Sequence, residues 1–179
     1  PFIAMEFLDG QPLQRICRRV RRDTGHGLPL ALYLRVLVDL LAGLHHAHEL
    51  CDYDGRPLGL VHRDVTPHNV IVTHEGQVKL IDFGIARGFE SCADTQVGTF
   101  KGKASYCAPE QARGERVDRR ADLFAVGVML WEALTQRRMW PELDEVAIVQ
   151  RLRAGEVPAL ADGPHPELRA VCRRALAIA

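Results

Sequence analysis

Residues 121–134 constrain the fold more than any other segment, because they are apolar on every face of a helix. Within this stretch only Asp122 and Glu132 carry a charge. A helix that is hydrophobic all round is stable only where other elements cover it. The sequence therefore predicts a buried helix here, around which the rest of the fold is built.

The other apolar patterns predict further helices and small β pieces. Residues 30–50 read as a long helix with one apolar stripe, formed by Leu34, Leu37, Leu40, Leu41 and Leu44. Two β-branched runs, 70–73 and 78–81, predict a hairpin, and Asp54-Gly55 predicts a tight turn. We expect a strand at 2–5, helices at 11–22, 143–153 and 166–179, and a mobile loop over 86–104. The predicted fold class is mainly α with small β-hairpins.

Composition excludes several kinds of protein. Lys+Arg and Asp+Glu both number 23, so no global basic field points to a nucleic-acid partner. The 5 cysteines form no CxxC pair, which favours free thiols in a reducing compartment over a zinc site or disulfide framework. No apolar run approaches the roughly 20 residues of a membrane span, and no signal peptide is visible. We therefore expect a cytoplasmic segment, with any membrane anchor of the full-length protein outside it.

Basic residues gather on the first predicted helix, at positions Arg18, Arg19, Arg21 and Arg22. They could form a docking patch for a partner. A solvated helix face is the favoured interpretation, because runs of like charge usually face water.

Three oxygen-bearing side chains in the middle of the chain fit phosphoryl transfer. That reaction needs a carboxylate that orients the attacking hydroxyl, and oxygen ligands that hold Mg²⁺ against nucleotide phosphates. Residues 62–69 offer Asp64 and Asn69 from one loop. The predicted hairpin then brings the chain back to Asp82, so that Asp82 is expected beside Asn69. Gly84 permits the backbone angles that a turn after Phe83 needs.

These motifs, in this order and spacing, resemble the C-terminal lobe of a eukaryotic-type Ser/Thr protein kinase. The segment His62-Arg63-Asp64 with Asn69 resembles the catalytic loop, and Asp82-Phe83-Gly84 resembles the metal-binding start of the activation segment. Ala108-Pro109-Glu110 resembles the end of that segment. The insertion at residues 54–59 resembles bacterial, especially myxobacterial-type, members.

The resemblance implies a protein-kinase-like fold, α+β in the full domain, of which this chain holds the C-lobe only. Residues 1–10 resemble the last strand of the N-lobe and the hinge. Residues 11–179 resemble the C-lobe, incomplete at its C-terminal end. The missing N-lobe of the same polypeptide is therefore an expected partner.

The resemblance also assigns roles at the reaction centre. Asp64 is expected to orient the substrate hydroxyl and accept its proton, and Asn69 and Asp82 are expected to bind Mg²⁺. ATP is the expected nucleotide. Its adenine is expected to contact four residues: the gatekeeper Met5, the backbone of Glu6 and Leu8, and the side chain of Ile71.

Regulatory and structural roles follow from the same resemblance. Arg63 is expected to receive a phosphate from the activation loop, for which Thr95 and Thr99 are the best candidates. Structural roles are expected for His62, Phe83, Gly84, Glu110 and Asp122. Among these, Asp122 would anchor a loop, and Glu110 would form an ion pair with an Arg beyond Ala179.

Two positions depart from the family pattern. Thr66 stands where Ser/Thr kinases usually carry Lys, and Lys103, after Gly102, stands where they usually carry Thr. The two positions normally touch across the active site, so the sequence resembles a Lys/Thr exchange in which both residues keep catalytic roles. Pro67 still matches the Ser/Thr pattern.

The expected function is the transfer of the γ-phosphoryl group of ATP to Ser/Thr hydroxyls of protein substrates, with the fragment alone inactive. The alternative is a pseudokinase scaffold that binds protein partners, which Thr66 keeps open. A small-molecule phosphotransferase is disfavoured, because those enzymes lack a long activation segment ending in Ala-Pro-Glu.

Overall fold

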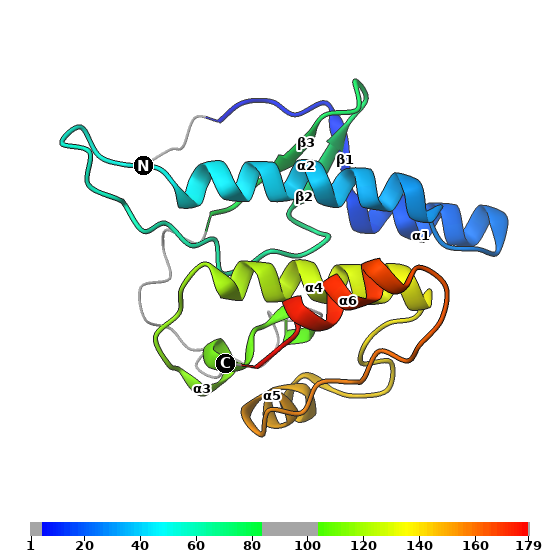
Figure 1. Cartoon of the computed structure of the whole chain (residues 1–179). Helices are drawn as coiled ribbons and strands as arrows, with labels where there is room; N and C mark the ends of the chain where they lie inside the picture. The colour runs from blue at the N-terminus through cyan, green and yellow to red at the C-terminus, as the bar shows by residue number, and fades with distance from the viewer. Residues whose placement is uncertain (1–4, 84–103, 179) are drawn as a thin grey trace.

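The buried helix predicted from residues 121–134 is α4 (Arg120–Thr135). The computed structural model describes residues 5–83 and 104–178. Within them, α4 packs against α2 (Leu30–His48), α6 (Pro166–Ala175) and η1 (Ala104–Tyr106) (Figure 1). Val128 and Met129 are fully buried, and Phe124 is 4% exposed. The all-round apolarity of this segment is thus explained by neighbours on several sides.

The leucine-rich segment forms α2 (Leu30–His48), which packs on α4 and on β3. Leu37, Leu40 and Leu44 are buried, whereas Leu41 is 36% exposed at the edge of the stripe. By length and composition alone, α2 could cross a membrane, which corrects the expectation that no apolar run approaches that length. Its inward face instead belongs to the core, which accounts for much of its apolarity.

A small antiparallel sheet of order β1-β2-β3 lies beside α2. The predicted hairpin is confirmed as β2 (Val70–Thr73) and β3 (Val78–Leu80), with Gly76 at a φ of 82° in the turn. Strand β1 (Gly10–Pro12) was not predicted. A Cβ at Gly10 would lie 2.5 Å from the carbonyl oxygen of Val72, so a larger residue would disrupt this pairing.

The first helix, α1 (Leu13–Thr24), begins two residues later than predicted, because Gln11 and Pro12 pair with β2 instead. It ends at Gly25, whose left-handed conformation (φ 75°) suits glycine. Of the strand predicted at 2–5, residues 2–4 lie outside the described residues. Met5 is not in a strand.

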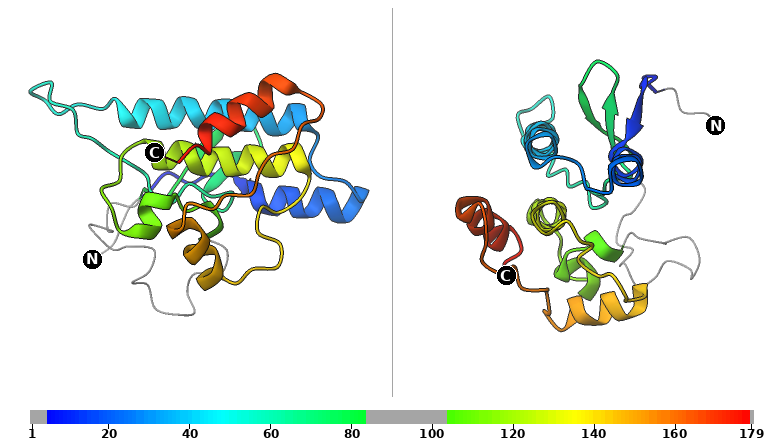
Figure 2. Two further views of the ribbon diagram at one scale, coloured as in Figure 1. Left: turned by 60° about the horizontal axis from the view of Figure 1, so that its bottom comes forward. Right: turned by 90° about the vertical axis from the view of Figure 1, so that its right-hand side faces the viewer.

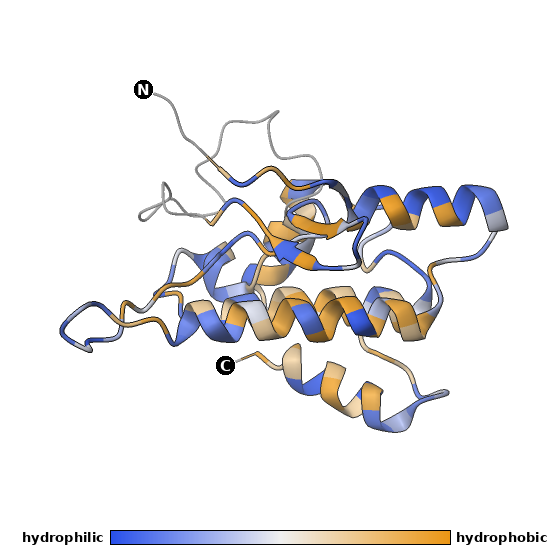
Figure 3. Ribbon diagram, turned by 90° about the horizontal axis from the view of Figure 1, so that it is seen from above, coloured by the Kyte–Doolittle hydropathy of each residue, from blue (hydrophilic) through white to orange (hydrophobic). Residues whose placement is uncertain are grey.

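The remaining elements lie on the side of α4 away from α2 (Figures 1 and 2), where α6 and η1 pack on α4 and α5 packs on α3 and η1. Asp144 caps α5 by accepting a hydrogen bond from the Ala147 N–H at 2.8 Å. The last helix ends at Ala175, earlier than the predicted 179. Figure 3 shows polar and apolar positions interspersed along the outer helices, as expected where one face is buried. The bounds are η1 (Ala104–Tyr106), α3 (Pro109–Arg113), α5 (Glu145–Arg153) and α6 (Pro166–Ala175).

The tight turn predicted at Asp54-Gly55 is confirmed. An isolated antiparallel bridge joins Cys51 to Pro57, and Gly55 has a φ of 78°. The Asp52 carboxylate accepts hydrogen bonds from two backbone N–H groups of the turn, each at 2.9 Å. The loop predicted at 86–104 lies outside the described residues, apart from Ala104 in η1.

Candidate active site

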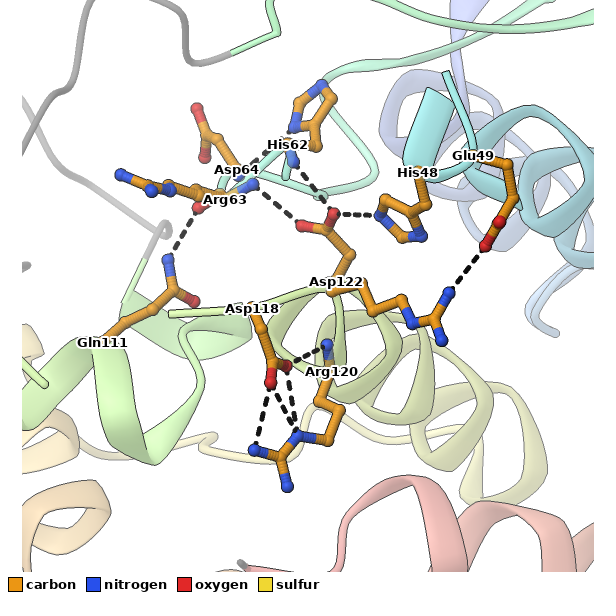
Figure 4. Close-up of polar contacts among 10 residues, drawn as sticks. His48, Glu49, His62, Arg63, Asp64, Gln111, Asp118, Arg120 and Asp122 are labelled. Carbon is orange, nitrogen blue, oxygen red and sulfur yellow. Dashed lines mark hydrogen bonds and ion pairs between the residues drawn. The ribbon is translucent and has the colours of Figure 1, made fainter. Parts of the chain in front are cut away.

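The loop at residues 62–69 is held by one buried carboxylate from α4. Asp122 is 1% exposed and accepts hydrogen bonds from the backbone N–H groups of His62 at 2.9 Å and Arg63 at 2.8 Å. The Nε2 atom of His48 lies 2.8 Å from the same carboxylate (Figure 4). A buried carboxylate is tolerated only with such partners. Asp122 therefore anchors the loop to the core helix.

Two residues near this loop adopt a backbone conformation that non-glycine residues avoid. The φ angle is 65° at Arg63 and 59° at Asp82. A left-handed conformation costs roughly 1–3 kcal/mol at such a residue and persists only where neighbours hold it. At Arg63 the N–H is held by Asp122, and the carbonyl accepts from the Gln111 side chain at 2.9 Å. Strain of this kind clusters at functional sites.

His62 ties the loop to the strand end before Asp82. Its Nε2 lies 3.0 Å from the Ile81 carbonyl oxygen, which can only accept, so Nε2 carries the proton. Burial lowers the pKa of His62, which favours the neutral ring. Nδ1 is then an acceptor, and the Asp64 N–H donates to it at 3.2 Å. The ring of Phe83 packs on His62 with centroids 4.6 Å apart.

Asn69 links the Asp64 end of the loop to the segment that leads into Asp82. Its Nδ2 donates to the Asp64 carbonyl at 2.8 Å, so its side-chain oxygen faces away from that carbonyl. Its own carbonyl accepts from the Ile81 N–H at 2.9 Å. These contacts tie the backbone of Asp64 and Ile81 to Asn69, and the convergence of the side-chain oxygens of Asp64, Asn69 and Asp82 stays a prediction.

Oxygen donors at this place suit a hard cation. Asn69 is 7% exposed and offers an amide oxygen, while Asp82 is exposed and offers a carboxylate. The described residues contain no cluster of three or more His, Cys, Asp or Glu that could hold a metal alone. Mg²⁺ is commonly held by one or two protein oxygens together with substrate phosphates. The donor set thus fits Mg²⁺ shared with a nucleotide.

Thr66 stands out at the centre of the loop. It is 2% exposed, and its hydroxyl has no hydrogen-bond partner among the described residues. A buried hydroxyl without a partner is costly, and so it often marks a contact that another group completes. Lys103, the residue predicted to face it, lies outside the described residues, as do Gly84, Thr95 and Thr99.

The residues predicted to contact adenine differ in burial. Ile71 in the central strand β2 is buried, Leu8 is half-buried, and Glu6 is exposed with its carboxylate 3.5 Å from Lys79 Nζ of β3. Met5 is 79% exposed. An exposed methionine is available to a further layer of structure or to a ligand.

Two residues that support the site, His48 and Gln111, were missed by the sequence analysis. His48 binds Asp122 from 74 residues away, and no local pattern indicates this pair. Gln111 accepts from the Ala108 N–H at 3.0 Å and donates to Arg63. The first of these bonds had a local signal, since a Gln at the third position of a helix often bonds back to the residue before it. Glu110, beside Gln111 in α3, is half-buried.

Comparison with known proteins agrees with this geometry. A family profile described as "Protein kinase domain" matches residues 2–167. The tyrosine-protein kinase MasK of Myxococcus xanthus (strain DK1622) is 46% identical over 168 residues, covering 94% of this chain and 25% of the relative. The probable serine/threonine-protein kinase SCO3848 of Streptomyces coelicolor is 36% identical over 181 residues, covering 98% of this chain and 25% of the relative. The serine/threonine-protein kinase PknL of Mycobacterium tuberculosis is 34% identical over 170 residues, covering 93% of this chain and 39% of the relative. The chain thus spans well under half the length of these curated relatives.

Proposed function

The chain belongs to the protein kinase family and has bacterial relatives, and from this membership we propose that the full-length protein transfers the γ-phosphoryl group of ATP to Ser/Thr hydroxyls of protein substrates. The observation that carries the proposal is one hydrogen-bonded network, held by Asp122 and His62. It joins Asn69 to the backbone of Asp64 and to that of Ile81, the residue before Asp82. Phosphoryl transfer depends mainly on such positioning.

Each residue of the network has a distinct task in the proposed mechanism. The Asp64 carboxylate orients the acceptor hydroxyl and accepts its proton as the bond to phosphorus forms. Mg²⁺, when bound by the Asn69 oxygen and the Asp82 carboxylate, neutralises phosphate charge. The neutral His62 ring keeps Asp64 and the Asp82 segment in a fixed relation, because it bonds to the backbone of both.

We propose that Thr66 and Lys103 carry the threonine and lysine usual in Ser/Thr kinases at exchanged positions. A cation beside the transferring phosphate stabilises the charge of the transition state. Thr66 cannot supply that charge, whereas a Lys side chain is long and flexible enough to reach across a site. The hydroxyl of Thr66 is buried and has no hydrogen-bond partner among the described residues, which supports a contact completed by another group. We assign that contact to Lys103.

The acceptor residue is the point on which the relatives differ. MasK is named a tyrosine-protein kinase, while SCO3848 and PknL are named serine/threonine kinases. Tyrosine phosphorylation is therefore the second candidate, favoured by the 46% identity to MasK. Pro67, which follows the Ser/Thr pattern, favours serine and threonine.

The proposed kinase needs more than this segment. We propose that residues 1–10 form the last strand of the N-lobe and the hinge, and that residues 11–179 belong to the C-lobe, which is incomplete at its C-terminal end. An N-lobe of the same polypeptide would then hold the phosphates. On this proposal the segment alone is inactive and cytoplasmic. A pseudokinase scaffold remains the alternative if the full-length protein binds partners without turnover.

The test uses the full-length protein with γ-labelled ATP, Mg²⁺ and generic protein substrates, followed by phosphoamino-acid analysis. The proposal predicts Mg²⁺-dependent label on serine and threonine. Label on tyrosine alone would replace it with the second candidate. If no substrate is labelled although the full-length protein binds protein partners, the scaffold function is favoured.

A further inference from the structure

Figure 2 shows that α1, the start of α2 and the end of α4 come together at one end of the molecule. Residues of these three segments, together with Pro67 of the catalytic loop, line a pocket. Its volume is about 190 Å³. That is below the roughly 300 Å³ at which pockets for drug-sized ligands begin. The space suits one side chain or one small anionic group, not a whole nucleotide.

Four arginines line this pocket. Arg18 and Arg21 come from α1, and Arg137 and Arg138 follow α4. The opposing charge is a single carboxylate, Glu132. Arginine presents a planar fork of donors that matches carboxylate and phosphate groups.

The carboxylate is already satisfied from within the protein. Glu132 accepts hydrogen bonds from the Tyr106 hydroxyl at 2.8 Å and the Met139 N–H at 3.2 Å, and Arg138 lies 3.2 Å away. One arginine is thus used to balance it. Burial raises the pKa of Cys17, another lining residue, so its thiol adds no negative charge at neutral pH.

In the part of the chain that the structure describes, three of these guanidinium groups therefore have no acidic partner. Among the described residues no ion pair joins Arg18, Arg21 or Arg137 to a carboxylate, and Arg21 donates only to the neutral Gln136 carbonyl at 2.8 Å. Neighbouring like charges repel each other. An anion in the pocket would relieve that repulsion and gain charge-assisted hydrogen bonds.

The pocket is close to the reaction centre along the chain. Pro67 lines it, and the Pro67 carbonyl accepts from the Gln14 N–H at 2.9 Å. Pro67 is three residues from Asp64, so the two Cα atoms lie within about 10 Å. An extended peptide advances about 3.3 Å per residue and covers that distance in about three residues.

We propose that this pocket binds an acidic or phosphorylated side chain of the protein substrate, about two to five residues from the acceptor hydroxyl. The inference rests on the proposed kinase function and names its substrate class. An aspartate and a phosphoserine share the chemistry that the arginines recognise. They differ in source, since phosphoserine requires an earlier phosphorylation of the substrate.

The test compares synthetic peptides on the full-length protein. The peptides share one acceptor and differ at a single flanking position, which is Asp, phosphoserine, Ala or Arg. We expect kcat/KM for the Asp or the phosphoserine peptide to exceed that for the Ala peptide by at least about tenfold, the effect of one charge-assisted hydrogen bond. Whichever of the two is preferred identifies the source. Equal rates for all peptides, or a preference for Arg, would overturn the proposal.

Two double variants test whether the preference for an acidic side chain depends on this pocket. Arg18→Ala with Arg137→Ala should remove the preference while leaving the rate on the Ala peptide near wild type. Arg19→Ala with Arg22→Ala is the control, because these side chains pair with Asp23 and do not line the pocket. A preference that survives in the pocket variant would refute the assignment.

A binding measurement separates this inference from the proposed function. If no peptide is phosphorylated, the kinase proposal fails, and fluorescence anisotropy with a labelled phosphoserine peptide still tests the pocket. The expected result is binding about tenfold weaker in the pocket variant than in the control. Equal affinity in both variants would show that the arginines bind no anion of this kind.

Discussion

Replacing Asp122 by asparagine tests the anchor of the catalytic loop most sharply. The carboxylate uses Oδ2 for the His62 N–H and for His48, and Oδ1 for the Arg63 N–H. An amide has only one oxygen. Its NH₂ group must therefore face a buried N–H donor at one of these positions.

The expected loss of stability combines two terms. One hydrogen bond to a charged acceptor, about 1.5–3 kcal/mol, is lost, and one buried donor is left unpaired at a cost of about 1–3 kcal/mol. The sum is about 2.5–6 kcal/mol, which corresponds to a fall in Tm of roughly 5–24 °C for a domain of this size. Turnover should fall as well, since Arg63 and Asp64 follow directly on the loosened backbone.

Calorimetry of the full-length protein measures this effect. The transition of the kinase domain is the one that ATP with Mg²⁺ shifts to higher temperature. The control is Asp118→Asn at the N-terminal end of the same helix, where an exposed side chain bonds to Arg120. Its stability should change by no more than about 0.5 kcal/mol. Equal Tm values for the two variants would refute the anchoring role of Asp122.

Four further predictions address single side chains. Burial lowers the pKa of His62, so that below about pH 6.5 the unfolded state binds more protons than the folded state. The free energy of unfolding should therefore fall by up to about 1.4 kcal/mol for each pH unit below that value. This slope should be lost in His62→Asn, and an unchanged slope would contradict the assignment. Thr66→Val should leave stability unchanged or raise it by about 1 kcal/mol, because the hydroxyl has no partner among the described residues; a clear loss in urea denaturation would reveal a bond to it. Lys103→Ala should lower kcat far more than the substitution of the surface residue Lys79, and an unaffected kcat would end the exchange hypothesis. Mass spectrometry of active protein should find phosphate on Thr95 or Thr99, and an unmodified segment at full activity would count against regulation there.

Local patterns in the sequence predicted most of the helices. The all-apolar segment became α4, and the leucine stripe became α2, because burial follows the helical period. Strand β1 was missed because its structure depends on pairing with β2, some 60 residues away along the chain. Gln11 has no local feature that favours a strand over the helix predicted there. Element ends shifted for similar reasons, as at Pro12, where pairing delays the start of α1.

In the candidate site, too, contacts with a local signal were predicted and contacts that depend on the tertiary fold were missed. Spacing along the chain predicted that Asp64, Asn69 and Asp82 converge, because the hairpin between Asn69 and Asp82 brings the chain back toward Asn69. The bond from His48 to Asp122 spans the fold and has no local signal. The arginines of α1 were interpreted as a solvated face. All four are exposed, which agrees with that interpretation, but Arg18 and Arg21 also lie beside residues more than 100 positions later, which only the tertiary fold reveals.

The most direct test of the kinase proposal is the effect of Asp64→Asn on turnover and on nucleotide binding in the full-length protein. The control is Asp54→Asn, an exposed carboxylate at the tip of the turn. Loss of the general base should lower kcat by about 10²–10⁴-fold while the Kd for ATP with Mg²⁺ stays near wild type. A near wild-type kcat in Asp64→Asn, or a loss of nucleotide binding equal to the loss of turnover, would contradict the role proposed for Asp64.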